Sequence, residues 1–295
     1  MKPAHLILLL LMNFCWASVY SAYKVLALPT GGIVTLRFAL AAIVLLLAWP
    51  WLPGKAPRGA DLVKSCLLGV VSFVVGQRLQ VYGNEIGSAS NSAVLMSFEP
   101  LITTCAAALV LKEQLGPRRI VGFALAIAGV GLLNGVWRRD FKMASMAASF
   151  IFISSFICEA IFSVVAKPVI MRASIMKMLA ISLAIGTVMN LAIDGQSTLR
   201  AARMLSTFDW GVLALLGVVC TAIGYSVWFL VIRECPVSVA ALTIFAQTVF
   251  GVLVAAVWLG EKLKREHLAG SLTIIAGLVI GLSRQVHAGE AARKV

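Results

Sequence analysis

Ten long apolar segments, separated by short stretches rich in proline, glycine and charge, constrain this chain more than any other feature. A helix needs about 20 mostly apolar residues to cross the hydrocarbon core of a membrane. The segments span residues 5–26, 32–52, 62–83, 88–111, 118–137, 143–166, 174–194, 209–232, 236–259 and 266–284. The connecting stretches are too short to hold a further helix. We therefore predict an all-α polytopic membrane protein with ten transmembrane helices.

The composition excludes an ordinary soluble domain. Hydrophobic residues make up 61% of the chain and charged residues 13%, against about 45–50% and about 25% in globular domains. The net charge is +13, and basic residues such as Lys55, Arg58, Arg118 and Arg119 lie between the apolar segments. Positive charge in such places fixes the sidedness of loops and meets anionic headgroups. We therefore expect membrane lipid as a partner, and no nucleic acid.

An internal repeat divides the chain into two halves. At an offset of 148 residues, the sequence LLGVV at residues 67–71 recurs at residues 215–219, and further matches follow without a gap. An offset of 143 residues overlays the first span on the sixth. The predicted halves are residues 1–141 and 142–295, each with five spans, which together form one membrane domain.

Five is an odd number of spans, so the second half must enter the membrane inverted relative to the first. Inverted repeats with a site near the midplane are typical of secondary transporters, whose halves exchange conformations. With the N-terminus inside, fourteen Lys and Arg lie in inner loops and termini and nine in outer loops. The bias of basic residues toward the cytoplasm then predicts a bacterial inner-membrane protein with both termini cytoplasmic.

Three motifs carry a family resemblance. The hairpins that end the halves read LKEQL at residues 111–115 and LGEKL at residues 259–263, the fourth span contains EP at residues 99–100, and the first span spaces Trp16 and Lys24 eight apart. This pattern resembles the drug/metabolite transporter superfamily, and within it the ten-helix EamA-like exporter family. The likeness covers nearly the whole chain and extends to bacterial exporters of aromatic amino acids. It implies a transporter that exports small metabolites, with amino acids as the cargo.

The second half departs from the first at the EP motif, because residues 247–248 read QT where residues 99–100 read EP. A symmetric role for this pair is therefore in doubt.

Deep ionisable residues are functional candidates, because a charge at the bilayer centre costs roughly 2.5–3.5 kcal/mol on insertion scales. Glu99 in the fourth span and Glu159 in the sixth are the deep acids. Pro100 removes a backbone hydrogen bond beside Glu99, which predicts a hinge next to a cavity. The alternative is that Glu99 only pairs with Arg78 and ties the third and fourth spans together.

The first span carries Asn13, Trp16, Tyr20 and Lys24 at spacings that put them on one helix face. Core packing is the alternative interpretation of such a stripe. For a zwitterion, Arg78 suits the carboxylate and Glu99 or Glu159 the ammonium. The predicted substrate site, between the halves at mid-membrane, comprises Asn13, Trp16, Tyr20, Arg78, Tyr82, Glu99, Glu159, Tyr225, Trp228 and Gln247.

The function predicted is a secondary transporter that exports small metabolites by alternating access, most of all amino acids, aromatic ones and other neutral ones. A passive channel or facilitator for small solutes is an alternative, since its lining would use the same residues. A membrane-embedded enzyme is less favoured, because the sequence has no catalytic motif and no deep histidine. The six cysteines stand singly, so we expect no metal and no cofactor.

Glycines mark one face of the fifth span, at Gly122, Gly129 and Gly131, and one face of the tenth, at Gly270, Gly277 and Gly281. Small residues let helices approach closely. We interpret these faces as packing surfaces within the chain, and the alternative is the seam of a homodimer.

Overall fold

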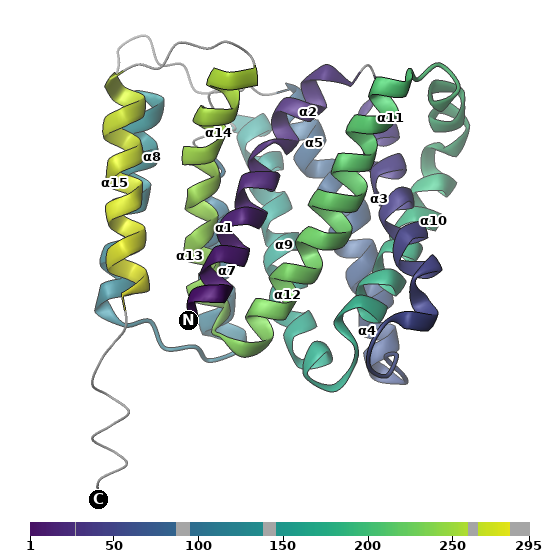
Figure 1. The fold of residues 1–295 in the computed structure, drawn as a ribbon, viewed down its shortest axis with the longest axis horizontal. Coiled ribbons are helices and arrows are strands. Elements are labelled where there is room, and N and C mark those ends of the chain that lie inside the picture. The colour runs from purple at the N-terminus through teal and green to yellow at the C-terminus, as the bar shows by residue number, and fades with distance from the viewer. Residues whose placement is uncertain (27, 87–94, 138–145, 259–264, 284–295) are drawn as a thin grey trace, which may run out of the picture.

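A computed structural model of the chain describes residues 1–26, 28–86, 95–137, 146–258 and 265–283. Within helices, it leaves the side chains of Tyr20, Ser21, Lys24, Asn84, Met146, Ala148, Ala255 and Trp258 undescribed. Every regular element in the described ranges is a helix, and the helices stand side by side between two ends of the molecule (Figure 1). Eight helical stretches are long and apolar enough to cross a membrane, and two shorter apolar helices complete the set. The prediction of an all-α polytopic membrane protein is confirmed.

Each predicted span contains a described helix, and several spans are built from shorter pieces. The first half comprises α1 (Pro3–Ala17) with α2 (Val19–Val25), α3 (Thr30–Leu47), α4 (Ala60–Val70) with η2 (Val71–Gly76) and α5 (Gln77–Ile86), α7 (Phe98–Val110) and α8 (Pro117–Asn134). The second half comprises α9 (Met146–Arg172), α10 (Ile175–Ala202), α11 (Thr207–Ala214) with η3 (Leu215–Ile223) and α12 (Gly224–Glu234), α13 (Val237–Leu242) with η4 (Thr243–Phe245) and α14 (Ala246–Trp258), and α15 (Arg265–Leu282).

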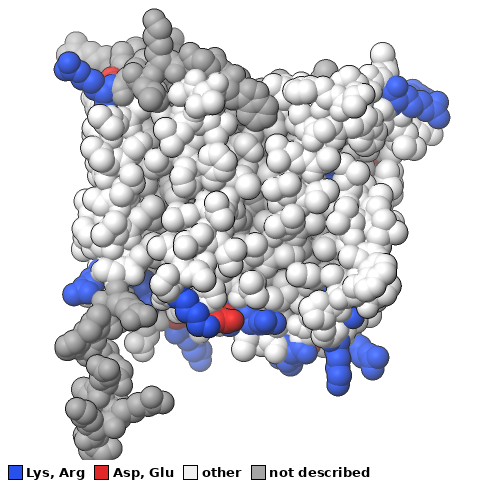
Figure 2. Space-filling model, viewed as in Figure 1, with Lys and Arg blue, Asp and Glu red and all other residues white. Residues whose placement is uncertain are grey.

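The two halves run in opposite directions. In Figure 1 helix α1 begins at the lower side and helix α9 at the upper side, and α15 ends at the lower side where α1 began. Lys and Arg gather along this lower edge, with smaller groups at the upper corners, and the flank between them is nearly free of charge on the face shown (Figure 2). A charge-free band between two charged rims is what lipid contact requires.

Helix packing follows the repeat. The third span packs on α9 and α10, and its counterpart, the eighth span, packs on α1 and α3. The glycines at the crossings correspond as well. A Cβ at Gly69 would overlap the carbonyl oxygen of Ser182, and a Cβ at Gly217 would lie 2.7 Å from the carbonyl oxygen of Arg37.

Helices α8 and α15 pack against each other along their glycine faces. A Cβ at Gly122 would come within 2.7 Å of the backbone of Gly281, and one at Gly129 within 2.8 Å of the carbonyl oxygen of Gly270. Gly122 and Gly129 therefore lie at a packing surface within the chain. Gly131, which was predicted on the same face, does not, because nothing lies within 4 Å of its Cβ position.

Irregular turns also recur at equivalent places. The π-helical segments η2 and η3 interrupt the third and eighth spans and overlap at the 148-residue offset. In the fourth span, α7 begins at Phe98 after its N-cap residue Ser97. Pro100 thus lies in the first turn of α7, where a proline costs no helical hydrogen bond, rather than in the middle of a continuous helix.

Candidate functional site

A small cavity lies inside the helix bundle, between residues of both halves. Its volume is about 60 Å³, which holds a few water molecules. Seven of the spans contribute to its wall, and polar and aromatic side chains predominate there. The lining residues are Trp16, Val19, Arg37, Gln77, Gln80, Met96, Glu99, Glu159, Tyr225 and Gln247.

Arg37 on α3 is the cation of this wall. Its side chain is buried, and its guanidinium donates to the hydroxyl oxygen of Tyr23, to Thr221 Oγ1 at 2.8 Å and to Gln77 Oε1 at 3.4 Å. Thr221 belongs to the π-helical segment η3, so Arg37 ties helix α3 of the first half to the irregular turn of the second. A guanidinium with three protein acceptors is a fixed charge in the bundle.

Two carboxylates face the same cavity. Glu159 on α9 accepts from Gln77 Nε2 at 2.8 Å and from the Tyr225 hydroxyl at 3.2 Å. Gln77 therefore bridges Arg37 and Glu159, and spreads the charge of the pair over a hydrogen-bonded chain. Glu99, in the first turn of α7, interacts with Glu159 through its charge.

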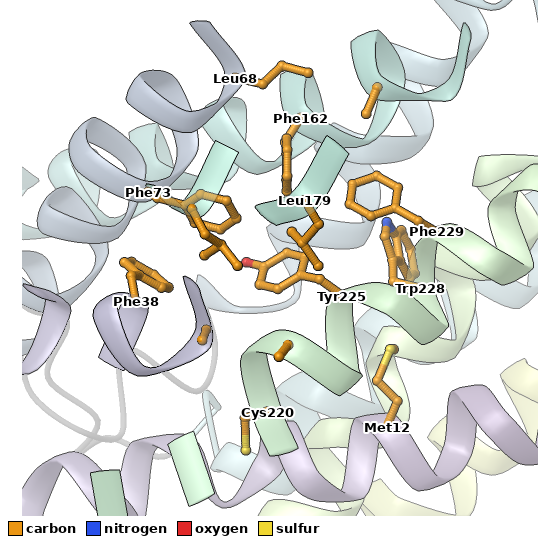
Figure 3. Close-up of a cluster of buried hydrophobic side chains, with 14 of the residues drawn as sticks. Met12, Phe38, Leu68, Phe73, Phe162, Leu179, Cys220, Tyr225, Trp228 and Phe229 are labelled. Carbon is orange, nitrogen blue, oxygen red and sulfur yellow. The ribbon is translucent and has the colours of Figure 1, made fainter. Parts of the chain in front are cut away.

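Aromatic rings form another part of the cavity wall. The ring centroid of Trp16 lies 5.5 Å from that of Tyr225 and 6.3 Å from that of Trp228. Figure 3 shows Tyr225 beside Phe73 and Phe162 in the buried cluster, with ring-centroid distances of 5.5 Å and 5.7 Å. These rings pack edge to face, which favours a fixed arrangement.

Both tryptophans use their indole N–H inside the bundle. Trp16 Nε1 donates to the carbonyl oxygen of Cys220 at 2.6 Å, and Trp228 Nε1 donates to Ser163 Oγ at 3.1 Å. Cys220 lies in the π-helical segment η3. Trp16 therefore serves both the cavity wall and the irregular turn.

Gln247 is held from behind by Asn13. Asn13 Oδ1 accepts from Gln247 Nε2 at 3.0 Å, and Asn13 Nδ2 donates to Thr243 Oγ1 at 3.1 Å. Asn13 itself is fully buried and does not line the cavity.

The predicted site residues fall into three groups. Trp16, Glu99, Glu159, Tyr225 and Gln247 line the cavity. Asn13 and Trp228 lie directly behind that wall, as their contacts with Gln247 and Trp16 show. The remaining three are Arg78 and Tyr82, which are not among the lining residues, and Tyr20, whose side chain lies outside the described part of the chain.

Arg78 pairs with helix α10 instead of Glu99. Its guanidinium donates to Asp194 Oδ2 at 2.8 Å and to Asn190 Oδ1 at 2.7 Å. The interpretation in which Arg78 neutralises Glu99 is therefore wrong. Tyr82, one turn further along α5, is 49% exposed.

Three polar residues of the wall were missing from the predicted site: Arg37, Gln77 and Gln80. The repeat contained a signal for two of them. At the 148-residue offset, Gln77 corresponds to Tyr225 and Gln80 to Trp228, both of which were predicted.

A family model covers nearly the whole chain. The model of the EamA-like transporter family matches it twice, at residues 4–135 and 146–282. The chain belongs to the EamA-like transporter family. Its two matched segments coincide with the two runs of five spans.

Named relatives of this EamA-like protein are transporters. It is 25% identical over 280 residues to a protein of Streptantibioticus cattleyicolor named "Probable terminal-alkyne amino-acid exporter", covering 92% of this chain and 91% of that protein. It is 30% identical over 216 residues to a protein of Salmonella typhimurium named "Probable amino-acid metabolite efflux pump", covering 68% of this chain and 69% of that protein. A solved crystal structure with 16% sequence identity matches the fold with a TM-score of 0.76, and covers 98% of this chain and all of the other.

The hairpin glutamate of this EamA-like chain ties the lower ends of three helices together. Glu113, after α7, accepts from the backbone N–H of Val237 at 2.8 Å, and from the N–H and hydroxyl of Ser238 at 3.0 Å and 2.7 Å. Lys167 on α9 lies 3.2 Å away. Burial raises the pKa of the Glu113 carboxyl, but the hydrogen bonds from Ser238 and Val237, with the Lys167 charge, outweigh burial and lower it overall. Glu113 is thus an ionised cap on the first turn of α13.

Proposed function

We propose that this protein is a secondary transporter that exports small metabolites, amino acids above all, across the bacterial inner membrane by alternating access. Residues 1–141 and 142–295 are the two inverted units that move against each other, and both termini face the cytoplasm. The observation that carries the proposal is the central cavity. It lies between residues of both halves and combines a fixed cation, two carboxylates and an aromatic face.

The chemistry of the cavity suits an amino acid with an apolar side chain. Carboxylates accept hydrogen bonds from an ammonium group, and aromatic faces take planar or aliphatic side chains. The names of the Streptantibioticus and Salmonella relatives support amino acids or their metabolites as the cargo.

The size of the cavity supports a moving mechanism. Ligand pockets commonly enclose about 300–1,000 Å³, and this cavity encloses about 60 Å³. A substrate therefore enters only when the helices around the cavity separate. The ties between Glu113, Lys167 and Ser238 would have to break on the lower side during that separation.

Counterflow in proteoliposomes tests the proposal. Vesicles loaded with an unlabelled amino acid should transiently accumulate the radiolabelled form above equilibrium, with saturation, and a panel of aromatic, small neutral and charged amino acids gives the preference. A channel equilibrates the label without an overshoot. Protein-free vesicles and a Glu159→Gln variant are the controls. The absence of uptake for every member of the panel would contradict the proposal.

The orientation has its own test. In a cysteine-free background, a cysteine at Gln114 should react with an impermeant thiol reagent only from the cytoplasmic side, and one at Arg203 only from the outside. Both positions are exposed, on connections at opposite ends of the helices. Reaction of both from one side would refute the inverted arrangement.

A further inference from the structure

The residues that line the cavity differ in their chemistry between equivalent positions of the repeat. The offsets of 143 and 148 residues pair its lining residues: Trp16 with Glu159, Gln77 with Tyr225, and Glu99 with Gln247. In each pair the residue on the α5, α7 and α9 side is acidic or an amide, and both carboxylates lie there. The residue on the α1, α12 and α14 side is an aromatic ring or the amide of Gln247. The two sets of lining residues therefore offer a ligand different groups, and they meet where the Tyr225 hydroxyl donates to Glu159.

The polar support behind the two walls also differs. Gln247 is held by Asn13, which also bonds Thr243. The residues equivalent to Asn13 and Thr243 are Phe156 and Leu95.

Phe156 and Leu95 form a buried apolar cluster with Phe152. This cluster cannot donate a hydrogen bond, and within the described part of the chain the Glu99 carboxylate makes no hydrogen bond or ion pair with a side chain. Glu99 therefore lacks, at the equivalent positions, the polar support that Asn13 and Thr243 give to the Gln247 side of the repeat.

The charges of the wall do not balance. Arg37 is 4% exposed, and it bonds Tyr23, Thr221 and Gln77. Gln77 in turn donates a hydrogen bond through Nε2 to Glu159 Oε1. Arg37 and Glu159 therefore compensate each other, and Glu99 is left without a cation among the described lining residues. Ionising a carboxyl group at this depth without a nearby cation is costly, so a cationic ligand that reaches Glu99 stabilises its ionised form and offsets that cost.

We propose that the group this transporter selects is the substrate's ammonium, that Glu99 holds it, and that the substrate's apolar part lies against Trp16 and Tyr225. The inference rests on the proposed function and deepens it. It makes the carboxylate of an amino acid dispensable, because the guanidinium of Arg37 is already bonded to protein oxygens. Primary amines with an aromatic or aliphatic tail are then substrates alongside amino acids, and carboxylates without an amine are not.

Matched ligands test this selection on the purified full-length protein in lipid nanodiscs by titration calorimetry. Phenylalanine, 2-phenylethylamine and 3-phenylpropionate share a phenyl ring and differ in the charged groups they carry. We expect phenylalanine and 2-phenylethylamine to bind within about tenfold of each other, and 3-phenylpropionate to bind more weakly than both by about tenfold or more, the scale of a hydrogen bond to a charged group. Binding of 3-phenylpropionate that equals or exceeds that of the amine would overturn the proposal.

The repeat supplies a matched control variant. Glu99→Gln should weaken 2-phenylethylamine binding by about tenfold or more. The double variant Glu99→Gln, Gln247→Glu keeps the net charge but moves the carboxylate to position 247. There Asn13, whose Oδ1 accepts from Gln247 in the wild type, can turn its amide and donate to the new carboxylate through Nδ2. Amine binding should therefore stay below that of the wild type. Full recovery in the double variant would overturn the assignment to Glu99. If neither variant folds, the binding of the three ligands to the wild-type protein still tests whether the ammonium group is selected.

The outcome separates this proposal from the proposed function. Counterflow of amino acids together with preferential binding of 3-phenylpropionate would support the proposed transporter function and refute the selection of the ammonium group. Amine binding without any amino-acid counterflow would support the selection of the ammonium group and refute the proposed export of amino acids.

Discussion

The two halves of this protein carry the same residues at the helix crossings and different residues around the cavity. At the crossings the two halves keep the same residue: Gly69 corresponds to Gly217 and Gly76 to Gly224. Each of these glycines lies where a Cβ would meet a neighbouring helix. Around the cavity the halves differ at every lining pair named above, as at Glu99 and Gln247.

Identical residues indicate a requirement that both halves share, and different residues indicate a requirement that falls on one half alone. If the halves exchange conformations, each needs the same close crossings, because packed interfaces tolerate little change in volume. The substrate has no such symmetry. A ligand with one charged end and one apolar end is bound best by two unlike walls. Substitutions at the crossings should therefore affect folding, and substitutions at the cavity should affect selectivity.

The largest effect is expected at the crossings. Gly69→Ala and Gly217→Ala each place a methyl group against backbone, at Ser182 and Arg37 respectively. Overpacking against backbone costs about 3 kcal/mol or more where neither helix can move. We expect both variants to lose most of their folded yield, Gly69→Ala more severely, as measured by size-exclusion profiles and thermal unfolding in detergent.

Gly131→Ala is the matched control for these variants. It is also a helical glycine, on α8, but nothing lies within 4 Å of its Cβ position. Alanine favours a helix over glycine by about 1 kcal/mol, so this variant should be as stable as the wild type or more so. A loss of stability in Gly131→Ala equal to that in Gly69→Ala would contradict the inference that close backbone contact makes Gly69 necessary.

A smaller effect is expected at Glu113, which the repeat also keeps, as Glu261 in the second half. Glu113→Gln removes a charge-assisted cap on the first turn of α13 and leaves Lys167 without its carboxylate. We expect a loss of about 1–3 kcal/mol, seen as a lower thermal midpoint. Because Glu113 lies outside the cavity, amino-acid preference in counterflow should not change.

The pH dependence of this loss follows from the lowered pKa of Glu113. A carboxyl whose pKa is lower in the folded state contributes stability above its unfolded value, about 4.3, and loses it as the pH falls through the folded value. The difference between wild type and Glu113→Gln should be constant above about pH 5 and shrink as the pH falls below about 4. A difference that grows on acidification would contradict the assignment of Glu113 as an ionised cap.

Much of the fold could be predicted from sequence because one rule dominates it. The need for about 20 apolar residues per crossing predicted ten spans, and each of them contains a described helix. The breaks within spans could not be predicted, because tertiary contacts support them. The irregular turn in η2 depends on Asn190, which donates to the carbonyl oxygen of Phe73 at 2.9 Å, and the turn in η3 depends on Trp16.

Part of the cavity wall could be predicted from the sequence, from depth for two acids and from helix spacing for Trp16, Tyr225 and Gln247. Glu99 and Glu159 are deep acids, and both line the cavity. Arg78 was placed beside Glu99 on the same reasoning, but its partner is Asp194, which lies at a non-helical break inside α10. Which acid a given base meets depends on helix rotation, and the sequence pattern does not fix rotation.

The smallest effect is expected on the aromatic wall, and it tests whether that wall sets side-chain preference. Trp16→Leu removes a ring that lies 5.5 Å from Tyr225, and Trp16→Phe keeps a ring there. Both variants lose the indole hydrogen bond to Cys220, so they share that cost. An aromatic pair contributes about 0.5–1.5 kcal/mol beyond burial, so Trp16→Leu should weaken phenylalanine binding about 2–10-fold more than alanine binding, and Trp16→Phe should not. An equal loss for both amino acids in both variants would place the side chain of the substrate elsewhere and return Trp16 to the packing role that its stripe on α1 also allows.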